Sequence, residues 1–399
     1  MRSLVLPSLT ATLAIGLGCG GGSGMTGTGG TTGTGGTSAP PPPGLATGGP
    51  FPFPQAKTSG SCTITSVANA ATATQNAYNS WKSSFVTSNG AGGFLRVQSP
   101  QHQGGTVSEG IGYGMIAAVY MADRPTFDGL WSFAKAHFDA KGLMNWKITS
   151  AGATASDGNG SATDGDEDMA WALLMASDQW SSTAYLEDAR AVIDAMYGSE
   201  IAGDGTLKPG DNWGGTTYYP DYFSPAYYRV FARATDNNTW SGVIIERNYA
   251  LLAAASGPNG LVPNGTDTAT FTMGMISTSM NFGYNACRMP WRIAMDYCFN
   301  GEPRAKAYLD KAGAFFNGLG AATNIGDGYT NAGQQTSGNH NMAIIGPAGT
   351  AGMAGFPTLL DGAFTFGVSG AGDSAYFTNT LRVVSMLMMS GNLLDYSHQ

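Results

Sequence analysis

The sequence has few charged residues, and basic ones are the scarcer kind. Charged side chains make up 12% of the 399 residues, and 27 acidic against 19 basic residues give a net charge of −8. A protein that binds nucleic acid neutralises phosphates with a stripe of Lys and Arg, which this sequence does not have. We therefore expect no nucleic-acid partner and favour an uncharged substrate.

Histidine and cysteine are also scarce, at four residues each. His102, His137, His340 and His398 are dispersed, and no His/Cys pair has the spacing of metal ligands. The glycine-rich sequence after residue 20 has no strand before it and no helix after it, so it is not a phosphate-binding loop. The sequence predicts neither a metal nor a cofactor.

The cysteines restrict disulfide formation. If Cys287 and Cys298 lie near one helical segment, about 16 Å of helical rise separates them, which is too far for a bridge. Cys62 with one of these two is the plausible intramolecular disulfide, and the third thiol is left over.

The N-terminal apolar run is too short to cross a bilayer. Arg2 precedes apolar residues 4–17, fewer than the ~20 that a membrane-spanning helix needs, and small residues follow, as in a bacterial export signal. Residues 16–19, Gly-Leu-Gly-Cys, are similar to a lipoprotein processing site. We expect a signal over 1–19 and lipidation of Cys19, which would hold the exported protein at the outer membrane or cell surface. Secretion without a lipid anchor is the alternative.

Residues 20–57 consist largely of Gly, Thr, Ser and Pro. Such a segment cannot bury enough apolar surface to offset its loss of conformational entropy. We predict a flexible linker over 20–57 and one globular domain over 58–399, which we expect to be a monomer.

Helical periodicity dominates the globular part. Apolar residues recur at helical spacing, with little Val/Ile/Thr alternation between the segments. The pattern predicts an all-α domain. The candidate helices are 65–86, 109–122, 126–140, 168–178, 183–198, 225–236, 239–256, 290–300, 303–319, 340–353, 356–368 and 375–391.

The connections between these helices alternate in length. Tight turns, such as 122–125 and 300–303, alternate with long loops rich in Gly, Asn, Asp and aromatic residues. This alternation predicts stacked helical hairpins whose long loops crowd one face. Long ordered loops on a rigid scaffold are where binding and catalysis concentrate, so we expect a site there.

Residues 164–168, Asp-Gly-Asp-Glu-Asp, place four acids directly before an apolar helical run. Asp164 and Glu167 match a D-x-x-E capping pattern, in which helix amides and the helix dipole stabilise acids at the N-terminus. The alternative is that one of these carboxylates takes part in a reaction. Taken alone, the stretch favours the cap.

Glu109 also lies at a predicted helix start, within Ser-Glu-Gly-Ile-Gly-Tyr-Gly-Met at 108–115. Three glycines lie within five positions there, and each costs a helix ~1 kcal/mol relative to alanine. Either a ligand approaches this backbone closely, or the glycines pack against neighbouring helices. We favour the ligand.

A third candidate stretch, 281–292, reads NFGYNACRMPWR. Pro290 suits the first turn of a helix, so Asn285 and Arg288 lie in the approach to it. An Arg in this position can orient a carboxylate or a sugar hydroxyl, or it can be an ordinary surface or capping residue.

Together these stretches resemble glycoside hydrolase family 8. Residues 162–180 match the family signature position by position, 108–115 are similar to the block with its general acid, and 284–292 are similar to its third block. Segments 143–146 and 223–228 are similar to parts that line the family's sugar cleft. The resemblance covers about 60–395 and implies an (α/α)6 barrel, in agreement with the helical periodicity.

The resemblance implies roles for the residues that match. Glu109 would donate a proton to the leaving glycosidic oxygen, Asp164 would bind and distort the sugar ring, and Arg288 would orient the acids. One tyrosine of the pair at 227–228 would lie near the reacting water. The candidate substrate-binding residues are Trp146, Trp213, Tyr227, Tyr228, Asn285 and Arg288.

The catalytic base is where the sequence departs from the family. Inverting hydrolysis, which the family implies, needs a neutral carboxylic acid and a charged carboxylate ~6.5–9.5 Å apart. Most members carry the base as an Asp where this chain has Asn285, and an amide cannot accept the proton of the attacking water. A subgroup with Asn takes a Glu from a loop before the third block, where this chain offers Asp267. Asp267 is the first candidate, then Asp221 and Asp211; an ordinary turn residue is the alternative for Asp267.

The resemblance implies an endo-acting hydrolase of a β-1,4-linked backbone, such as glucan, mixed-linkage glucan, chitosan or xylan. Asp204, Asp211 and Asp221 can meet the amino groups of chitosan or be ordinary loop acids. The alternative function is a catalytically inactive, surface-bound glycan-binding protein. Glu109 in its glycine setting favours the enzyme, because a binding protein needs no proton donor.

Overall fold

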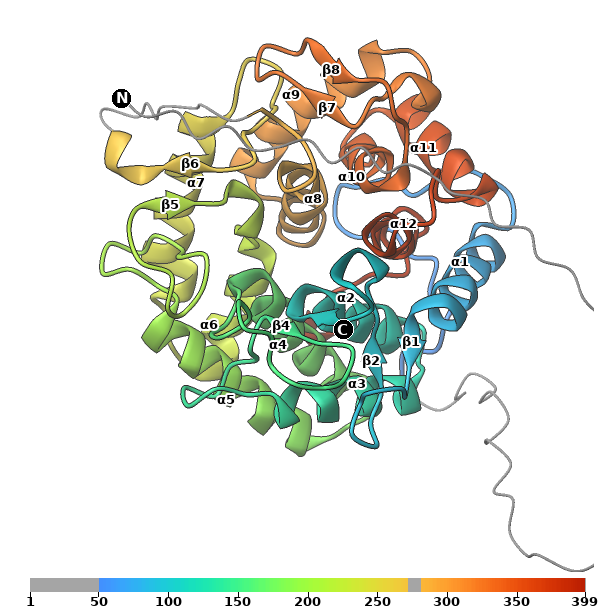
Figure 1. Ribbon diagram of the computed structural model, residues 1–399. Helices are drawn as coiled ribbons and strands as arrows, with labels where there is room; N and C mark the ends of the chain where they lie inside the picture. Colours follow the sequence, from blue (N-terminus) through green and yellow to red (C-terminus); the bar gives the residue numbers. More distant parts are fainter. Residues whose placement is uncertain (1–49, 272–280, 399) are drawn as a thin grey trace, which may run out of the picture. The chain divides into compact units, whose positions relative to one another are not determined.

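The computed structural model describes residues 50–271 and 281–398 (Figure 1). The expected export signal, Cys19 and most of the expected linker lie outside the described residues.

The described residues form twelve α-helices and eight very short strands, so the predicted all-α class is confirmed. Each predicted helix overlaps one observed helix. Within the described ranges, no helix is long and apolar enough to span a membrane. The helices are α1 (Ala70–Phe85), α2 (Ser108–Tyr120), α3 (Arg124–Ala136), α4 (Thr163–Gln179), α5 (Thr183–Ser199), α6 (Pro225–Thr235), α7 (Ile245–Ala255), α8 (Met289–Asn300), α9 (Pro303–Gly318), α10 (Met342–Gly352), α11 (Pro357–Ser369) and α12 (Tyr376–Met389).

The strands pair as four antiparallel two-stranded ribbons within the loops. They are β1 (Val86–Thr87) with β2 (Arg96–Val97), β3 (Thr106–Val107) with β4 (Lys147–Ile148), β5 (Thr217–Tyr218) with β6 (Thr266–Asp267), and β7 (Gly328–Tyr329) with β8 (Gln335–Ser337).

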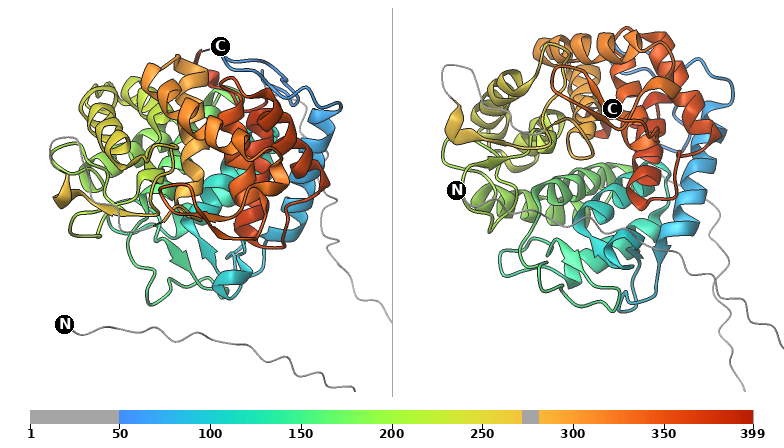
Figure 2. Two further views of the ribbon diagram at one scale, coloured as in Figure 1. Left: turned by 90° about the horizontal axis from the view of Figure 1, so that it is seen from above. Right: turned by 45° about the horizontal axis from the view of Figure 1, so that its top comes forward.

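The helices alternate between an inner and an outer ring. Helices α2, α4, α6, α8, α10 and α12 contact one another in that order, and α12 returns to α2, which closes the inner ring. Every residue of inner helix α10 is buried, whereas outer helix α3 buries one face. Figure 1 shows α8, α10 and α12 nearly end-on, and Figure 2 turns the barrel to show helices from the side. The predicted (α/α)6 barrel is confirmed.

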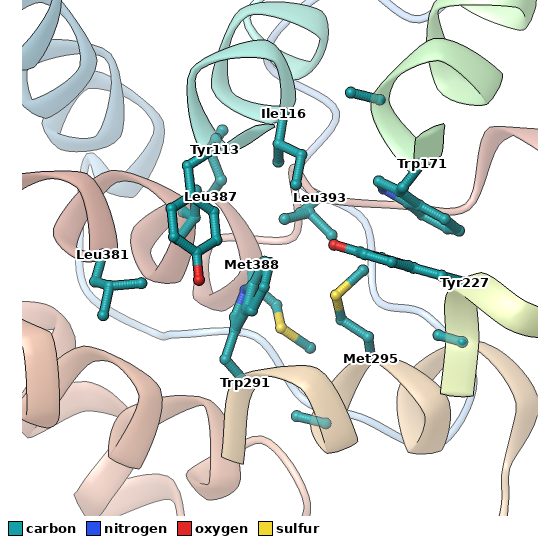
Figure 3. Packing of buried hydrophobic residues seen from close by; sticks show 14 of the residues in the cluster. Tyr113, Ile116, Trp171, Tyr227, Trp291, Met295, Leu381, Leu387, Met388 and Leu393 are labelled. Carbon is teal, nitrogen blue, oxygen red and sulfur yellow. The ribbon is translucent and has the colours of Figure 1, made fainter. Parts of the chain in front are cut away.

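Aromatic, methionine and aliphatic side chains fill the space inside the inner ring (Figure 3). Trp171 of α4 stacks on Tyr227 of α6 with ring centroids 4.5 Å apart, and Tyr113 of α2 meets Trp291 of α8 edge-on at 6.0 Å. All four are buried, and burying one large apolar side chain contributes roughly 1.5–3 kcal/mol. Because the interior is packed, a substrate site must lie at an end of the barrel.

The long connections gather at one end. Residues 137–162 lead into α4, 200–224 into α6 and 319–341 into α10, whereas 121–123 and 301–302 leave inner helices as tight turns. Every long connection therefore precedes an inner helix, and the long loops surround the N-terminal ends of the inner ring. The predicted alternation is confirmed.

The glycines of α2 allow close helix packing. A Cβ on Gly112 would lie 2.7 Å from Cβ of Asp168 and 3.0 Å from the carbonyl oxygen of Gly165 in α4. A Cβ on Gly165 would in turn lie 2.6 Å from Oγ of Ser108. The favoured interpretation, a ligand against this backbone, is wrong, because α2 and α4 cross too closely to admit a side chain.

Residues 50–57 belong to the domain, so the boundary predicted at 58 is wrong. The ring of Phe51 stacks on Tyr396 with centroids 4.1 Å apart, and its amide donates to the side chain of Gln179 at the end of α4. The amide of Lys57 donates to the carbonyl of Gly391 at 2.9 Å. Phe51, within the Pro-rich sequence, thus packs against Tyr396 at the end of the barrel away from the long loops.

Cys62 and Cys298 form a disulfide across 236 residues of sequence, and Cys287 is a buried free thiol. The bridge joins the segment before α1 to α8. The prediction that Cys62 pairs with one of the other two is confirmed.

We expect replacement of Cys62 and Cys298 by Ser to lower the free energy of unfolding by about 2–4 kcal/mol, because the bridge restricts the unfolded chain. Denaturant unfolding with and without reductant measures the effect. Reductant should destabilise the unaltered protein and a Cys287→Ala control alike, and leave the double variant unchanged. Equal stability of the oxidised and reduced protein would contradict this expectation.

Candidate active site

Three carboxylates surround one guanidinium at the end of the barrel where the long loops gather. Nη1 of Arg288 donates to Oε2 of Glu109 and Oδ2 of Asp164, at 2.6 Å each. Nη2 of Arg288 donates to Oδ2 of Asp221. The structure thus brings together Glu109, Asp164 and Arg288, as the sequence predicts, and adds Asp221; we call these four residues the Arg288 cluster.

Each member of the Arg288 cluster stands at the start of an inner helix. Glu109 and Asp164 are the second residues of α2 and α4, and Arg288 directly precedes α8. Asp221 lies in the short 3₁₀ helix Pro220–Tyr222, before α6. The first amides of a helix lack intrahelical acceptors and carry partial positive charge, which favours carboxylates there.

The Arg288 cluster is closed to solvent except at Glu109. The side chains of Arg288, Asp164 and Asp221 are 3%, 4% and 0% exposed, against 18% for Glu109. Buried charges are stable only when paired, and one arginine serves all three acids. Glu109 is the acid of the cluster most open to a ligand.

The surroundings of Glu109 favour its neutral form. Burial raises its pKa to about 7; Arg288 opposes this rise and the charge of Asp164 adds to it. Tyr376, the first residue of α12, donates its hydroxyl to Oε1 of Glu109 at 2.8 Å, which lowers the pKa by less than burial raises it. A carboxyl group with a pKa near 7 can donate a proton at neutral pH.

A second arginine repeats the pairing one helical turn further along α8. Arg292 donates to both oxygens of Asp168, at 2.9 and 3.0 Å, and lies 3.0 Å from Glu167. Arg288 and Arg292 are four residues apart, and so are their partners Asp164 and Asp168. Residues four apart lie on one helix face, so α8 and α4 match turn for turn.

The acidic segment 164–168 is therefore a buried part of α4 and not a solvated cap. Helix α4 begins five residues earlier than predicted, its N-cap is Ala162, and no side chain caps it. Glu167 accepts hydrogen bonds from the hydroxyls of Ser224 and Tyr228. The predicted D-x-x-E capping box is wrong, because Asp164 is not the N-cap. The expectation that acids occupy the helix start is confirmed, since Asp164 and Asp166 lie in the first turn of α4.

Comparison with known proteins shows which family the chain belongs to. The model of the glycosyl hydrolases family 8 matches residues 51–391. The chain belongs to that family. It is 39% identical over 327 residues to Endoglucanase A from Acetivibrio thermocellus, covering 78% of this chain and 68% of that protein. It is 36% identical over 371 residues to Endoglucanase C from Ruminiclostridium cellulolyticum, covering 88% of this chain and 79% of that protein.

The solved structure of a Beta-1,3-1,4-glucanase from Paenibacillus sp. X4 has the same fold. It superposes with a TM-score of 0.78 at 29% identity, over 86% of this chain and 98% of that one. The family resemblance read from the sequence is confirmed, and the protein is a glycoside hydrolase.

Trp146 and Trp213, the tryptophans predicted to bind substrate, are both partly exposed, as platforms for sugars must be. The carbonyl of Trp146 accepts from the amide of Ser108 at 2.9 Å, and its ring N–H donates to the carbonyl of Asp157. Trp146 is thereby fixed beside the first turn of α2. The ring of Trp213 meets Tyr219 edge-on at 6.5 Å. Both remain candidates for sugar binding.

The tyrosines predicted to face the reacting water do not reach it. Tyr227 points into the packed core inside the inner ring (Figure 3), and the hydroxyl of Tyr228 donates to Glu167. The prediction is wrong, because both side chains are used in helix packing. Tyr222 lies at the cluster instead, with its ring 5.4 Å from the central carbon of Arg288.

Sequence reasoning misses three residues at the Arg288 cluster. Tyr222 and Phe377 lie over the guanidinium, the latter at 5.9 Å, and Tyr376 binds Glu109. Tyr376 and Phe377 begin α12, outside the stretches whose resemblance to the family assigned the site residues. Tyr222 directly precedes the segment 223–228 that resembles the family, and extending that comparison by one residue would find it.

The structure does not bring Asp267 or Asp211 to the cluster. Asp267 is exposed in β6, and its Oδ1 accepts from the amide of Ala269, as the turn-residue alternative requires. Figure 1 places β6 on the rim of the ring, away from α2 and α4. Asp211 is paired with Lys141 at 2.8 Å. Asp267 is thus held within its own turn, whereas Asp211 is bound by residues of the loop before α4.

Asp166 and Glu200 form a pair of fully buried carboxyl groups beside the acidic segment. Burial and the charge of Glu200 raise the pKa of Asp166 well above its usual range, and burial raises the pKa of Glu200 to about 8. The amide of Met144 donates to Asp166, and the hydroxyl of Ser161 donates to Glu200. Two adjacent carboxylates disfavour double ionisation, so the pair keeps a proton at neutral pH.

The raised pKa of Glu200 predicts that stability falls with rising pH. Between about pH 4.5 and pH 8 the folded protein holds a proton that the unfolded chain releases, so stability declines by at most about 1.4 kcal/mol per pH unit. Glu200→Gln should reduce this slope and be more stable than the unaltered protein at pH 9. Denaturant unfolding across this pH range measures it, with exposed Glu187→Gln on α5 as the control. If the stability of Glu200→Gln and of the unaltered protein declined equally with pH, the raised pKa of Glu200 would be refuted.

Proposed function

We propose that this family 8 enzyme cleaves the β-1,4-linked backbone of an uncharged glucan from within the chain, with inversion at the anomeric carbon. The observation that carries the proposal is the raised pKa of Glu109, about 7, in a carboxyl group that Arg288 holds beside Asp164. The names of the relatives, Endoglucanase A and Endoglucanase C, support a glucan substrate.

In this proposal Glu109 donates its proton to the leaving glycosidic oxygen, as a pKa of about 7 allows. Asp164 is fixed by Arg288 and by the amide of Gly165, so it can bind the ring that is cleaved and hold it in a distorted shape. Trp146 would present its face to a flanking sugar.

The loop acids favour an uncharged substrate over chitosan. Asp204, Asp211 and Asp221, which could meet amino groups, are each paired with a cation of the protein. A carboxylate that already binds a cation offers little attraction to a second one. The setting of Glu109 also argues against an inactive glycan-binding protein, because binding alone needs no proton donor. On the N-terminal sequence we further propose export, with Cys19 as a lipid anchor.

Glu109→Gln should lower kcat on soluble glucan about 100- to 10,000-fold, because an amide supplies no proton to the leaving oxygen, while oligosaccharide binding persists. Reducing ends released from soluble glucan, chitosan and xylan measure the activity. Glu187→Gln is the matched control and should equal the unaltered protein. No release from any of the three by the unaltered protein would refute the enzyme, and release from chitosan alone would refute the choice of substrate.

The pH dependence of kcat should report Glu109. The reaction needs its protonated form, so kcat on glucan should fall as the pH rises through about 7. An aryl glycoside with a good leaving group needs less protonation and should show a weaker alkaline decline. An alkaline decline of equal steepness on both substrates would contradict this role of Glu109.

A further inference from the structure

We propose that Asp221 is the catalytic base, the carboxylate that takes the proton of the attacking water. This inference rests on the proposed function. It assigns the role that the side-chain amide of Asn285 cannot fill.

Asp221 is the acid of the Arg288 cluster that has an oxygen to spare. Both oxygens of Glu109 and both of Asp164 accept hydrogen bonds from the protein. Oδ2 of Asp221 is held by Arg288, whereas its Oδ1 is buried and has no partner among the described residues. Leaving a buried acceptor unpaired costs ~1–3 kcal/mol. A water that arrives with the substrate would supply the missing hydrogen bond.

The guanidinium keeps this carboxylate apart from the proposed acid. Glu109 binds Nη1 of Arg288, and Asp221 binds Nη2. Inverting hydrolysis needs a gap between the two carboxyl groups, ~6.5–9.5 Å, so that a water fits between base and sugar. The two carboxylates are thus bound to separate nitrogens of one guanidinium, and the positive charge of Arg288 lies between them.

Asp221 also lies on the side of the guanidinium that faces Asn285. Nε and Nη2 of an arginine share one edge, as the two-point pairing of Arg229 with Asp296 shows. In Arg288, Nε donates to the carbonyl of Asn285, and Nη2 donates to Asp221. The side chain of Asn285 is exposed and donates to the carbonyl of Asn264 at 3.3 Å, so it brings no carboxylate to this edge.

The environment of Asp221 suits a base. Burial raises its pKa and the Arg288 charge limits that rise. A carboxylate of raised pKa binds a proton more strongly, which favours removal of a proton from water. Asp267, by contrast, is exposed, and hydrogen bonds from its own turn lower its pKa.

The proposed step balances. The water oxygen bonds to the anomeric carbon while the bond from that carbon to the leaving oxygen breaks. The water proton passes to Oδ1 of Asp221, and the proton of Glu109 passes to the leaving oxygen. The reaction ends with Asp221 neutral and Glu109 charged, and proton exchange with solvent restores both.

The test uses β-cellobiosyl fluoride, whose fluoride leaves without a donated proton. Asp221→Asn should lower kcat on it at least about 100-fold, and azide should restore turnover with α-cellobiosyl azide as product. Glu109→Gln keeps the base and should still hydrolyse the fluoride without a gain from azide. Asp310→Asn, an exposed acid on α9, is the matched control and should equal the unaltered protein.

Two more variants distinguish loss of the base from displacement of Arg288, which would also lower activity. Asp221→Gly makes room for azide and should be rescued more strongly. Asn285→Asp added to Asp221→Asn supplies a carboxylate from the residue whose backbone carbonyl already accepts from Nε of Arg288, and it should recover activity. Melting temperature and oligosaccharide binding show whether each variant is folded.

Three results would overturn the assignment. One is an Asp221→Asn variant within about tenfold of the unaltered kcat. Another is loss in both Asp221 variants with no azide product and no recovery in the double variant, which would make Asp221 a positioning residue for Arg288. The third is azide rescue of Asp267→Asn instead. Each leaves the proposed function standing, because that function fails only if the unaltered protein releases nothing from glucan.

Discussion

Two buried arginines on one helix, matched to two buried aspartates on another, are the interaction on which the rest of this barrel depends. Arg288 and Arg292 of α8 pair with Asp164 and Asp168 of α4 at the same spacing of four residues. Removing one partner of such a buried pair typically costs 3–5 kcal/mol, because the other charge is left uncompensated. The two helices are therefore fixed in one register, and the glycine contact between α2 and α4 sets how closely the next helix approaches.

The same charges hold the fold and define the site. Long loops precede the inner helices, so helix N-termini converge at one end of the barrel. Their amides favour carboxylates, and the arginines compensate the resulting negative charge. Glu109 lies at the edge of this group, where burial raises its pKa while part of its side chain still faces outward. A proton donor arises there because burial raises the pKa of Glu109 by more than the charge of Arg288 lowers it.

The sequence predicted that each helix exists, but it did not predict where α4 begins. Periodicity finds all twelve helices because it records which residues face the core, a local property of each segment. The start of α4 is missed because Asp164 and Gly165 are poor helix formers, and because the sequence does not show that Arg288, 124 residues away, pairs with Asp164 there. The domain boundary is missed for a similar reason, since Phe51 becomes ordered through its stack on Tyr396.

The sequence by itself determined the fold class, the family, the pairing of Glu109 and Asp164 with Arg288, and the absence of a carboxylate at position 285. The fold class follows from residue types at short spacing, which the chain carries whatever its conformation, and the pairing with Arg288 was implied by the resemblance of three stretches to the family. Only the tertiary structure decided that Tyr227 and Tyr228 are core residues, that Asp267 stays on the rim, and that Asp221 reaches Arg288. Which of many loop acids meets a given arginine depends on how separate loops pack over the helix ends, and no local pattern encodes that.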